Sequence, residues 1–259
     1  MKKIITLSFF LFVSLFNSFA QYDHPFWLNV VYIGNSITQG VIIDTPRKNA
    51  PPVKASIYLH QQPNVGEVKF SNQGVSGKTT VDFLPETGTF FEKVKAAADT
   101  LSKDTWATLI FSVMLGTNDS AIEGPNGSPV SPENYYTNMK KIIDELLRLY
   151  PDALFVLHSP VWYSPDTYNS SRYLQEGLDR LQSYFPEIDK LVETYKVSHP
   201  KQVYAGDRDA FDFFKENHQE YFIPENGNAG VFYLHPNEAG AARLGQFWGK
   251  AIYNVLINP

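Results

Sequence analysis

Hydrophobic residues along the chain gather in five short runs. These runs predict strands at 28–34, 67–71, 107–115, 153–159 and 202–206. The first of them, LNVVYIG, is a nearly continuous apolar run that ends in glycine. Short runs of this kind are typical of strands buried on both faces of a parallel sheet. The second run, EVKFS, alternates and is shorter.

Between these runs, apolar residues recur at helical spacing. We predict helices over 92–101, 132–150 and 171–197, and a last helix that starts after Pro236. Pro186 should interrupt the third of them, because a proline inside a helix removes a hydrogen bond and clashes with the preceding turn. Strands that alternate with helices predict a three-layer α/β/α, flavodoxin-like fold with a mostly parallel five-stranded sheet.

Four long segments show neither strand-like apolar runs nor helical spacing of apolar residues. They cover 41–53, 119–131, 160–170 and 216–234, and most of them follow predicted strands. Loops of this length in a compact domain are usually functional or mobile. Open α/β sheets bind ligands at the carboxyl ends of their strands. We therefore expect the functional site on the rim that these segments form.

The composition narrows the classes of protein. The chain has 259 residues, of which 43% are hydrophobic and 19% charged, as in an ordinary globular protein. Its net charge of −5 and the lack of a basic stripe argue against a nucleic-acid partner. Without cysteine it has neither disulfides nor thiolate chemistry. The six histidines lack metal-ligand spacing, and no nucleotide-binding motif is complete, so we predict neither metal nor cofactor.

The first twenty residues, MKKIITLSFFLFVSLFNSFA, have the layout of a secretory signal peptide. Two lysines precede the apolar stretch 4–16, and small residues precede a cleavage site between Ala20 and Gln21. The apolar stretch has about 13 residues, fewer than the ~20 that span a bilayer, so no membrane span is predicted. We expect a signal peptide at 1–20, a single domain at 21–259, and a secreted or periplasmic protein.

Four short blocks stand at the ends of predicted elements. Ser36 follows the first strand in GNSIT, Gly74 the second in SNQGVSG, and Asn118 the third in LGTND, while His235 opens the last helix in FYLHPNEAG. Each residue alone has an ordinary explanation as a helix cap or a turn residue. Together, in this order and across nearly the whole predicted mature chain, the blocks resemble those of the GDSL/SGNH hydrolase superfamily.

This resemblance implies a serine hydrolase. Ser36 would be the nucleophile and His235 the base that accepts its proton. The backbone N–H groups of Ser36 and Gly74 and the side-chain amide of Asn118 would form the oxyanion hole. Each donor of this kind can contribute ~3 kcal/mol to the stability of the transition state.

The sequence departs from the family at the acid that orients the histidine. The family usually has an aspartate three residues before the histidine, where this chain has Phe232. Three possibilities remain open: a Ser–His dyad, an acid from elsewhere, or a protein that binds without turnover. Glu225 and Asp207 are the candidate acids, and Asp119 is a more distant one.

The substrate is indicated by the rim segments. Trp162 and Tyr163 lie there among amide and hydroxyl side chains, and such mixtures suit sugar rings. Exported SGNH proteins with a GNSIT-type first block resemble carbohydrate esterases. We therefore expect removal of O-acetyl groups from a polysaccharide or sialic acid through an acetyl-enzyme, with Trp162 and Tyr163 contacting the sugar. The alternatives are a lipase, arylesterase or thioesterase of the same fold, and a glycan-binding protein on an impaired esterase scaffold.

Overall fold

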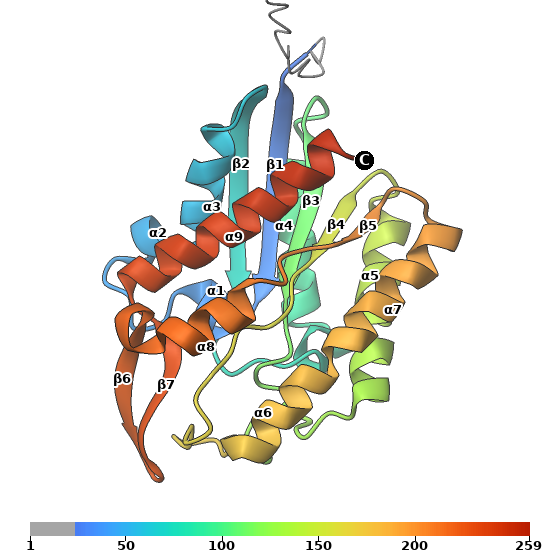
Figure 1. Ribbon diagram of the computed structural model, residues 1–259. Helices are drawn as coiled ribbons and strands as arrows, with labels where there is room; N and C mark the ends of the chain where they lie inside the picture. The colour runs from blue at the N-terminus through green and yellow to red at the C-terminus, as the bar shows by residue number, and fades with distance from the viewer. Residues whose placement is uncertain (1–23) are drawn as a thin grey trace, which may run out of the picture.

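The computed structural model describes residues 24–259, which form a five-stranded sheet flanked by helices (Figure 1). All neighbouring strands are parallel, and their order is β2-β1-β3-β4-β5. The strands are β1 (Phe26–Gly34), β2 (Val65–Gly74), β3 (Thr108–Met114), β4 (Leu154–Leu157) and β5 (Val203–Ala205). The predicted strands and the three-layer α/β/α fold are thereby confirmed. The predicted signal peptide lies outside the described residues.

Helices cover both faces of this sheet. In Figure 1, α3 (Pro51–His60) and α9 (Glu238–Ile257) lie in front, whereas α4 (Phe90–Leu101) and α5 (Pro132–Leu149) lie behind. Helix α7 (Phe185–Ser198) packs against α5 and β5. This arrangement follows from right-handed crossovers between parallel strands, which place a helix on one face or the other according to the direction of each step along the sheet.

The core lies between the sheet and both helix layers. Tyr32 of β1, Phe111 of β3 and Trp248 of α9 are each at most 1% exposed. Tyr32 stacks on Trp248, and Phe111 stacks on Phe155 of β4. Such burial explains why the central strands read as continuous apolar runs in the sequence. Within residues 24–259, the helices are too short or too polar to cross a membrane.

Short elements surround the carboxyl ends of the strands. They are α1 (Ser36–Gln39), α2 (Pro46–Asn49), the 3-10 helices η1 (Val81–Phe83) and η2 (Pro85–Thr87), α6 (Leu174–Ser183), α8 (Ala210–Tyr221), β6 (Phe222–Gly227) and β7 (Gly230–Pro236). Strands β6 and β7 form a separate antiparallel hairpin, which projects beyond the sheet at the lower left of Figure 1. The interruption predicted at Pro186 occurs at Tyr184, where α6 ends and α7 restarts, and Pro186 lies in the first turn of α7.

Two of the segments expected to be irregular are ordered. Segment 41–53 contains α2 and the start of α3, because Pro51 and Pro52 occupy the first turn of a helix, where proline needs no N–H partner. Segment 216–234 contains the end of α8 and most of the β6–β7 hairpin. His235 therefore ends a strand rather than opening α9, and Asn237 caps that helix by accepting a hydrogen bond from the Gly240 N–H at 2.9 Å.

Candidate active site

Ser36 is the first residue of α1, directly after β1. The cap of this one-turn helix is Asn35, whose side chain accepts a hydrogen bond from the Ile37 N–H at 3.0 Å. A Cβ at Gly34 would overlap the side chain of Thr38, so the tight exit from the strand requires glycine. Because Asn35 caps the helix, the Ser36 hydroxyl is left for another partner.

That partner is His235. Its Nε2 lies 3.0 Å from the Ser36 Oγ, and its Nδ1 lies 2.9 Å from Glu225 Oε1. The same carboxylate oxygen accepts a hydrogen bond from the His235 backbone N–H at 3.3 Å. With the imidazole proton on Nδ1, His235 donates to Glu225 and accepts the hydroxyl proton of Ser36. The three side chains form one hydrogen-bonded chain, in which Ser36 and His235 are each 7% exposed.

The hairpin explains how Glu225 reaches this position. In the register of β6 and β7, Glu225 pairs directly with Phe232, the residue three before His235. The carboxylate thus enters from the strand opposite the position where a D-x-x-H motif would place it. Phe232 itself is 1% exposed and belongs to the core.

The other candidate acids lie elsewhere. Asp207 accepts hydrogen bonds from the N–H groups of Asp209 and Ala210 at the start of α8, and burial raises its pKa to about 6. Asp119 accepts hydrogen bonds from the N–H and hydroxyl of Thr80, and burial raises its pKa to about 6 as well. The structure brings neither carboxylate into hydrogen-bond contact with His235.

Asn118 is held in one orientation from both ends of its amide. Its Oδ1 accepts a hydrogen bond from the Tyr173 hydroxyl at 2.7 Å, and its Nδ2 donates to the Lys78 carbonyl at 2.9 Å. Because an amide nitrogen carries two hydrogens, the second remains available to a ligand. Asn118 is 4% exposed and Tyr173 is 3% exposed, so water competes little for these bonds.

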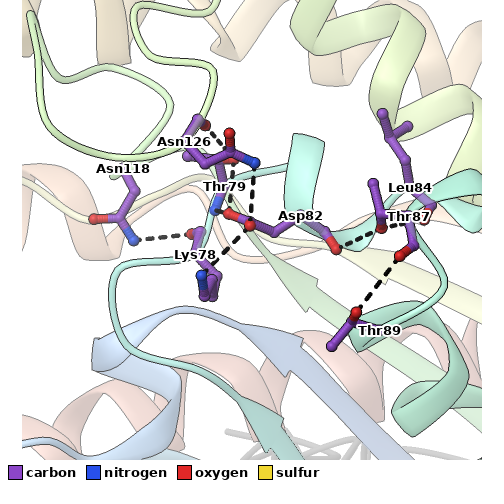
Figure 2. A network of polar contacts seen from close by, with 8 residues as sticks. All are labelled: Lys78, Thr79, Asp82, Leu84, Thr87, Thr89, Asn118 and Asn126. Atoms are coloured by element: carbon purple, nitrogen blue, oxygen red, sulfur yellow. Dashed lines mark hydrogen bonds and ion pairs between the residues drawn. The ribbon is translucent and has the colours of Figure 1, made fainter.

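Figure 2 shows how the Lys78 segment is itself fixed. The Asp82 carboxylate accepts hydrogen bonds from the Thr79 N–H at 3.0 Å and from Asn126 Nδ2 at 3.2 Å, and pairs with Lys78 Nζ at 3.4 Å. The Thr79 hydroxyl also donates to the Asn126 carbonyl at 2.8 Å. Through these bonds the loop after β2 is tied to the loop after β3, which carries Asn118.

The two glycines of SNQGVSG differ in the state of their N–H groups. The Gly74 N–H already donates to Asn72 Oδ1 at 2.9 Å. Gly77 has a left-handed φ of 74° and no hydrogen-bond partner for its N–H among residues 24–259. It lies between Ser76, whose N–H donates to Gln39 Oε1 at 2.7 Å, and Lys78, whose carbonyl accepts from Asn118. The oxyanion-hole residues expected from the sequence include Gly74 and not Gly77, although both glycines stand in the same motif.

The expected sugar-contacting aromatics are corrected by the structure. Trp162 is 5% exposed and packs against the rings of His218 and Phe222. Tyr163 is fully buried, and its hydroxyl lies 2.9 Å from the Ser120 Oγ. Both rings are core residues because the loop after β4 folds inward rather than standing on the rim. Neither offers a face to a sugar.

His158, at the end of β4, is a satisfied buried histidine. Its Nδ1 accepts a hydrogen bond from the Asp207 N–H at 2.9 Å, so its Nε2 carries the proton and donates to the Ser112 Oγ at 2.9 Å. Burial, assisted by the nearby Arg208 charge, lowers its pKa to about 3. Among the described residues, no three His, Asp or Glu side chains group as a metal site would require.

The model of the GDSL-like Lipase/Acylhydrolase family matches residues 32–243. No curated protein matches the chain. Among solved structures, Est24, a carbohydrate acetylesterase from Sinorhizobium meliloti, superposes with a TM-score of 0.58 at 17% identity over 88% of this chain and 99% of its own.

Two further structures show the same likeness. A catalytic mutant of Axe2, an acetylxylan esterase from Geobacillus stearothermophilus, has a TM-score of 0.58 at 17% identity and covers 91% of this chain and 96% of its own. The aryl esterase of M. smegmatis has a TM-score of 0.58 at 15% identity, with 88% and 99% covered. At these identities the solved structures support the fold, and the substrate has to be inferred from the residues of this chain.

Proposed function

The chain belongs to the GDSL-like lipase/acylhydrolase family, and from this premise we propose that it is a serine esterase that removes O-acetyl groups from carbohydrate. The observation that carries the proposal is the hydrogen-bonded chain from Ser36 through His235 to Glu225. A weak nucleophile, an imidazole base and an acid that orients the base are the parts that serine acyl transfer requires.

In the proposed reaction, Ser36 Oγ attacks the acetyl carbonyl while its proton moves to His235 Nε2. The Glu225 carboxylate stabilises the resulting imidazolium through Nδ1. Collapse of the tetrahedral intermediate breaks the ester bond, and His235 protonates the departing sugar hydroxyl, which leaves acetyl-Ser36. A water then gives its proton to His235 and attacks the acetyl group, and acetate and free Ser36 result.

The oxyanion of each intermediate needs fixed donors. We assign this role to the Ser36 N–H, the free hydrogen of Asn118 Nδ2 and the N–H of Gly77. Gly77 replaces Gly74 in this assignment because the Gly74 N–H is already bonded to Asn72, whereas the Gly77 N–H is unpaired among residues 24–259 and adjoins the Asn118 contact. The position of Ser36 at the start of α1 also directs backbone N–H groups toward the developing charge.

Two of the solved structures described above act on acetylated carbohydrate by their names, which supports the choice of substrate. Because an aryl esterase is among the similar structures, hydrolysis of other esters is the second candidate function. The continuous hydrogen-bond chain favours turnover over the third possibility, an impaired scaffold that only binds glycans.

The test is acetate release from acetylated xylan, acetylated pectin and O-acetylated sialosides, beside p-nitrophenyl esters of increasing chain length. We expect Ser36→Ala to lower kcat on every substrate by at least about 10³-fold. The control is Ser76→Ala, an exposed serine in the neighbouring loop, which should retain full activity. Full activity of Ser36→Ala would reject the nucleophile, and a preference for long acyl chains would favour a lipase.

A further inference from the structure

A pocket of about 380 Å³ opens next to the candidate active site. Its wall includes Gln39, Pro46, Arg47, Phe70, Asn72 and Gly74. Gln39 ends α1, three residues after Ser36. Since a helix rises 1.5 Å per residue, this wall starts about 5 Å along the helix from Ser36. A sugar chain whose acetyl group reached Ser36 would extend over distances of this size.

The amide side chains of the pocket can donate hydrogen bonds to a ligand, because their oxygen atoms already accept hydrogen bonds from the backbone. Gln39 Oε1 accepts the Ser76 N–H at 2.7 Å, and Asn72 Oδ1 accepts the Gly74 N–H at 2.9 Å. Asn72 Nδ2 gives one hydrogen to the Thr38 carbonyl at 2.9 Å and keeps the other. Within residues 24–259, Gln39 Nε2 has no hydrogen-bond partner. These internal bonds fix which end of each amide remains free.

The charge of the pocket is positive in a chain whose net charge is −5. Arg47 is exposed and forms no ion pair with the residues that the structure describes. None of the residues that line the pocket is acidic. Phe70, 36% exposed, adds an aromatic surface beside these donors. An unpaired guanidinium, amide donors and a ring face are together complementary to an anionic sugar.

We propose that this pocket is a subsite for the carboxylate of an acidic sugar, with Arg47 as the residue that selects it. This inference rests on the proposed esterase function, whose substrate class it narrows. The planar guanidinium binds a carboxylate with two parallel hydrogen bonds, the Gln39 and Asn72 amides donate to it from beside the guanidinium, and Phe70 packs against the sugar ring. Uronic acids and sialic acids both carry the required group.

Binding tests this subsite without catalysis. The probes are unacetylated trigalacturonate, sialyllactose and neutral xylotriose, titrated into the wild-type protein by calorimetry. We expect at least one acidic probe to bind tenfold or more tightly than xylotriose, and the acidic probe that binds identifies the source of the carboxylate. Arg47→Gln should weaken its binding by about 10- to 100-fold, as loss of a charged hydrogen-bond partner does.

The matched control is Lys48→Gln, which removes an exposed cation from the adjacent position outside the pocket. It should change the affinity for the acidic probe by less than about threefold. Equal losses in Arg47→Gln and Lys48→Gln would show diffuse attraction and overturn the subsite. Equal binding of acidic and neutral probes, or no binding of either, would overturn it as well.

Turnover separates this inference from the function on which it rests. On an acetylated acidic oligosaccharide, Arg47→Gln should lower kcat/KM by about 10- to 100-fold, while p-nitrophenyl acetate and acetylated xylan change by less than about twofold. If Arg47→Gln lowered all three equally, the subsite would be rejected and the esterase kept. If the wild-type protein hydrolysed none of them, the proposed function would fail, and the binding experiment would still judge the pocket.

Discussion

The side-chain amide of Asn118 shows how single hydrogen bonds determine what this site can do. Its oxygen and nitrogen have nearly the same shape, so packing alone would hardly distinguish the two orientations. The Tyr173 hydroxyl, a donor to Oδ1, and the Lys78 carbonyl, an acceptor from Nδ2, select one of them. The same logic applies to Gln39 and Asn72, whose carbonyl oxygens are taken by backbone N–H groups. Hydrogen bonds of this kind determine whether the oxygen or the nitrogen of each amide is available to a ligand.

Tyr173 is therefore expected to act as a positioning residue. Tyr173→Phe removes the donor to Asn118 Oδ1, so the amide can rotate. Its Nδ2 is then correctly oriented to donate to the oxyanion in a smaller fraction of the molecules. We expect kcat to fall by roughly tenfold, less than the 10²–10³ typical for complete loss of such a donor. KM should change little, because the oxyanion exists only after attack on the carbonyl.

The control for this change is Tyr163→Phe, another buried tyrosine, whose hydroxyl contacts Ser120 instead. It should leave kcat within about twofold, and steady-state kinetics on p-nitrophenyl acetate measures both. A rise in KM at constant kcat for Tyr173→Phe would contradict a role in the transition state.

At the scale of elements, the β6–β7 hairpin supplies both the base and its acid. Glu225 and His235 are ten residues apart along the chain, and the turn at the tip of the hairpin brings them together. Because opposite residues of an antiparallel pair lie side by side, an acid on one strand can replace an acid on the other. The short D-x-x-H motif and this cross-strand arrangement place a carboxylate at the same imidazole nitrogen.

Glu225→Gln tests the acid. An amide keeps the size of the side chain but can present its N–H₂ to Nδ1, which favours the wrong tautomer of His235. We expect kcat to fall by about 10²- to 10⁴-fold with little change in KM. The readout is kcat as a function of pH on p-nitrophenyl acetate.

The comparison variant is Asp207→Asn, which changes a buried carboxylate that does not touch His235. Its kcat should stay within a few-fold of the wild-type value. Full activity in both variants would instead support a Ser–His dyad without an acid.

At the scale of the whole molecule, the parallel sheet brings distant segments to one edge. Ser36 and His235 are 199 residues apart, and they meet because the β6–β7 hairpin, which lies between α8 and α9 in the chain, reaches the carboxyl end of β1. The same core contains His158, which stacks on Trp248 of α9 and is 1% exposed. Its neutral form is part of the packing between the sheet and that helix.

The stability of the protein should therefore depend on His158 in acid. Its pKa is about 3 in the folded chain and near 6.5 when exposed, so between these values the unfolded state binds a proton that the folded state does not. The contribution of His158 to the free energy of unfolding is fully present above about pH 6.5. It decreases as the pH falls below that value, by about 1.4 kcal/mol per pH unit.

Urea unfolding of the wild-type protein and of His158→Gln between pH 4.5 and 7.5 measures this contribution. As the pH falls, the free energy of unfolding should decrease more for the wild-type protein than for His158→Gln. The Asp207 carboxylate, whose pKa is also shifted, is present in both proteins and largely cancels in the difference. A constant difference over the whole range would mean that His158 takes up protons equally in the folded and unfolded states.

The class of fold can be predicted from the amino-acid sequence alone. The apolar runs at 28–34 and 107–115 predict strands because they are short and continuous, as in strands covered on both faces, and their alternation with helices predicts a parallel sheet. Ser36, Asn118 and His235 can be identified as site residues because their residue types, order and positions at element ends match one family. Local pattern was enough for these predictions, since strands, caps and motif order are properties of neighbouring residues.

The surroundings of these residues, in contrast, follow from how the chain folds in three dimensions. The tertiary structure placed Glu225 on His235 through the register of a hairpin whose sequence reads as loop, and it bonded Asp207 to backbone N–H groups at the start of α8. It buried Trp162 and Tyr163, which looked like rim residues, and it distinguished the N–H of Gly77 from that of Gly74. The contact between Glu225 and His235 depends on the register of the hairpin. The burial of Trp162 and Tyr163 depends on contacts with segments far apart in the chain, whose geometry no local pattern encodes.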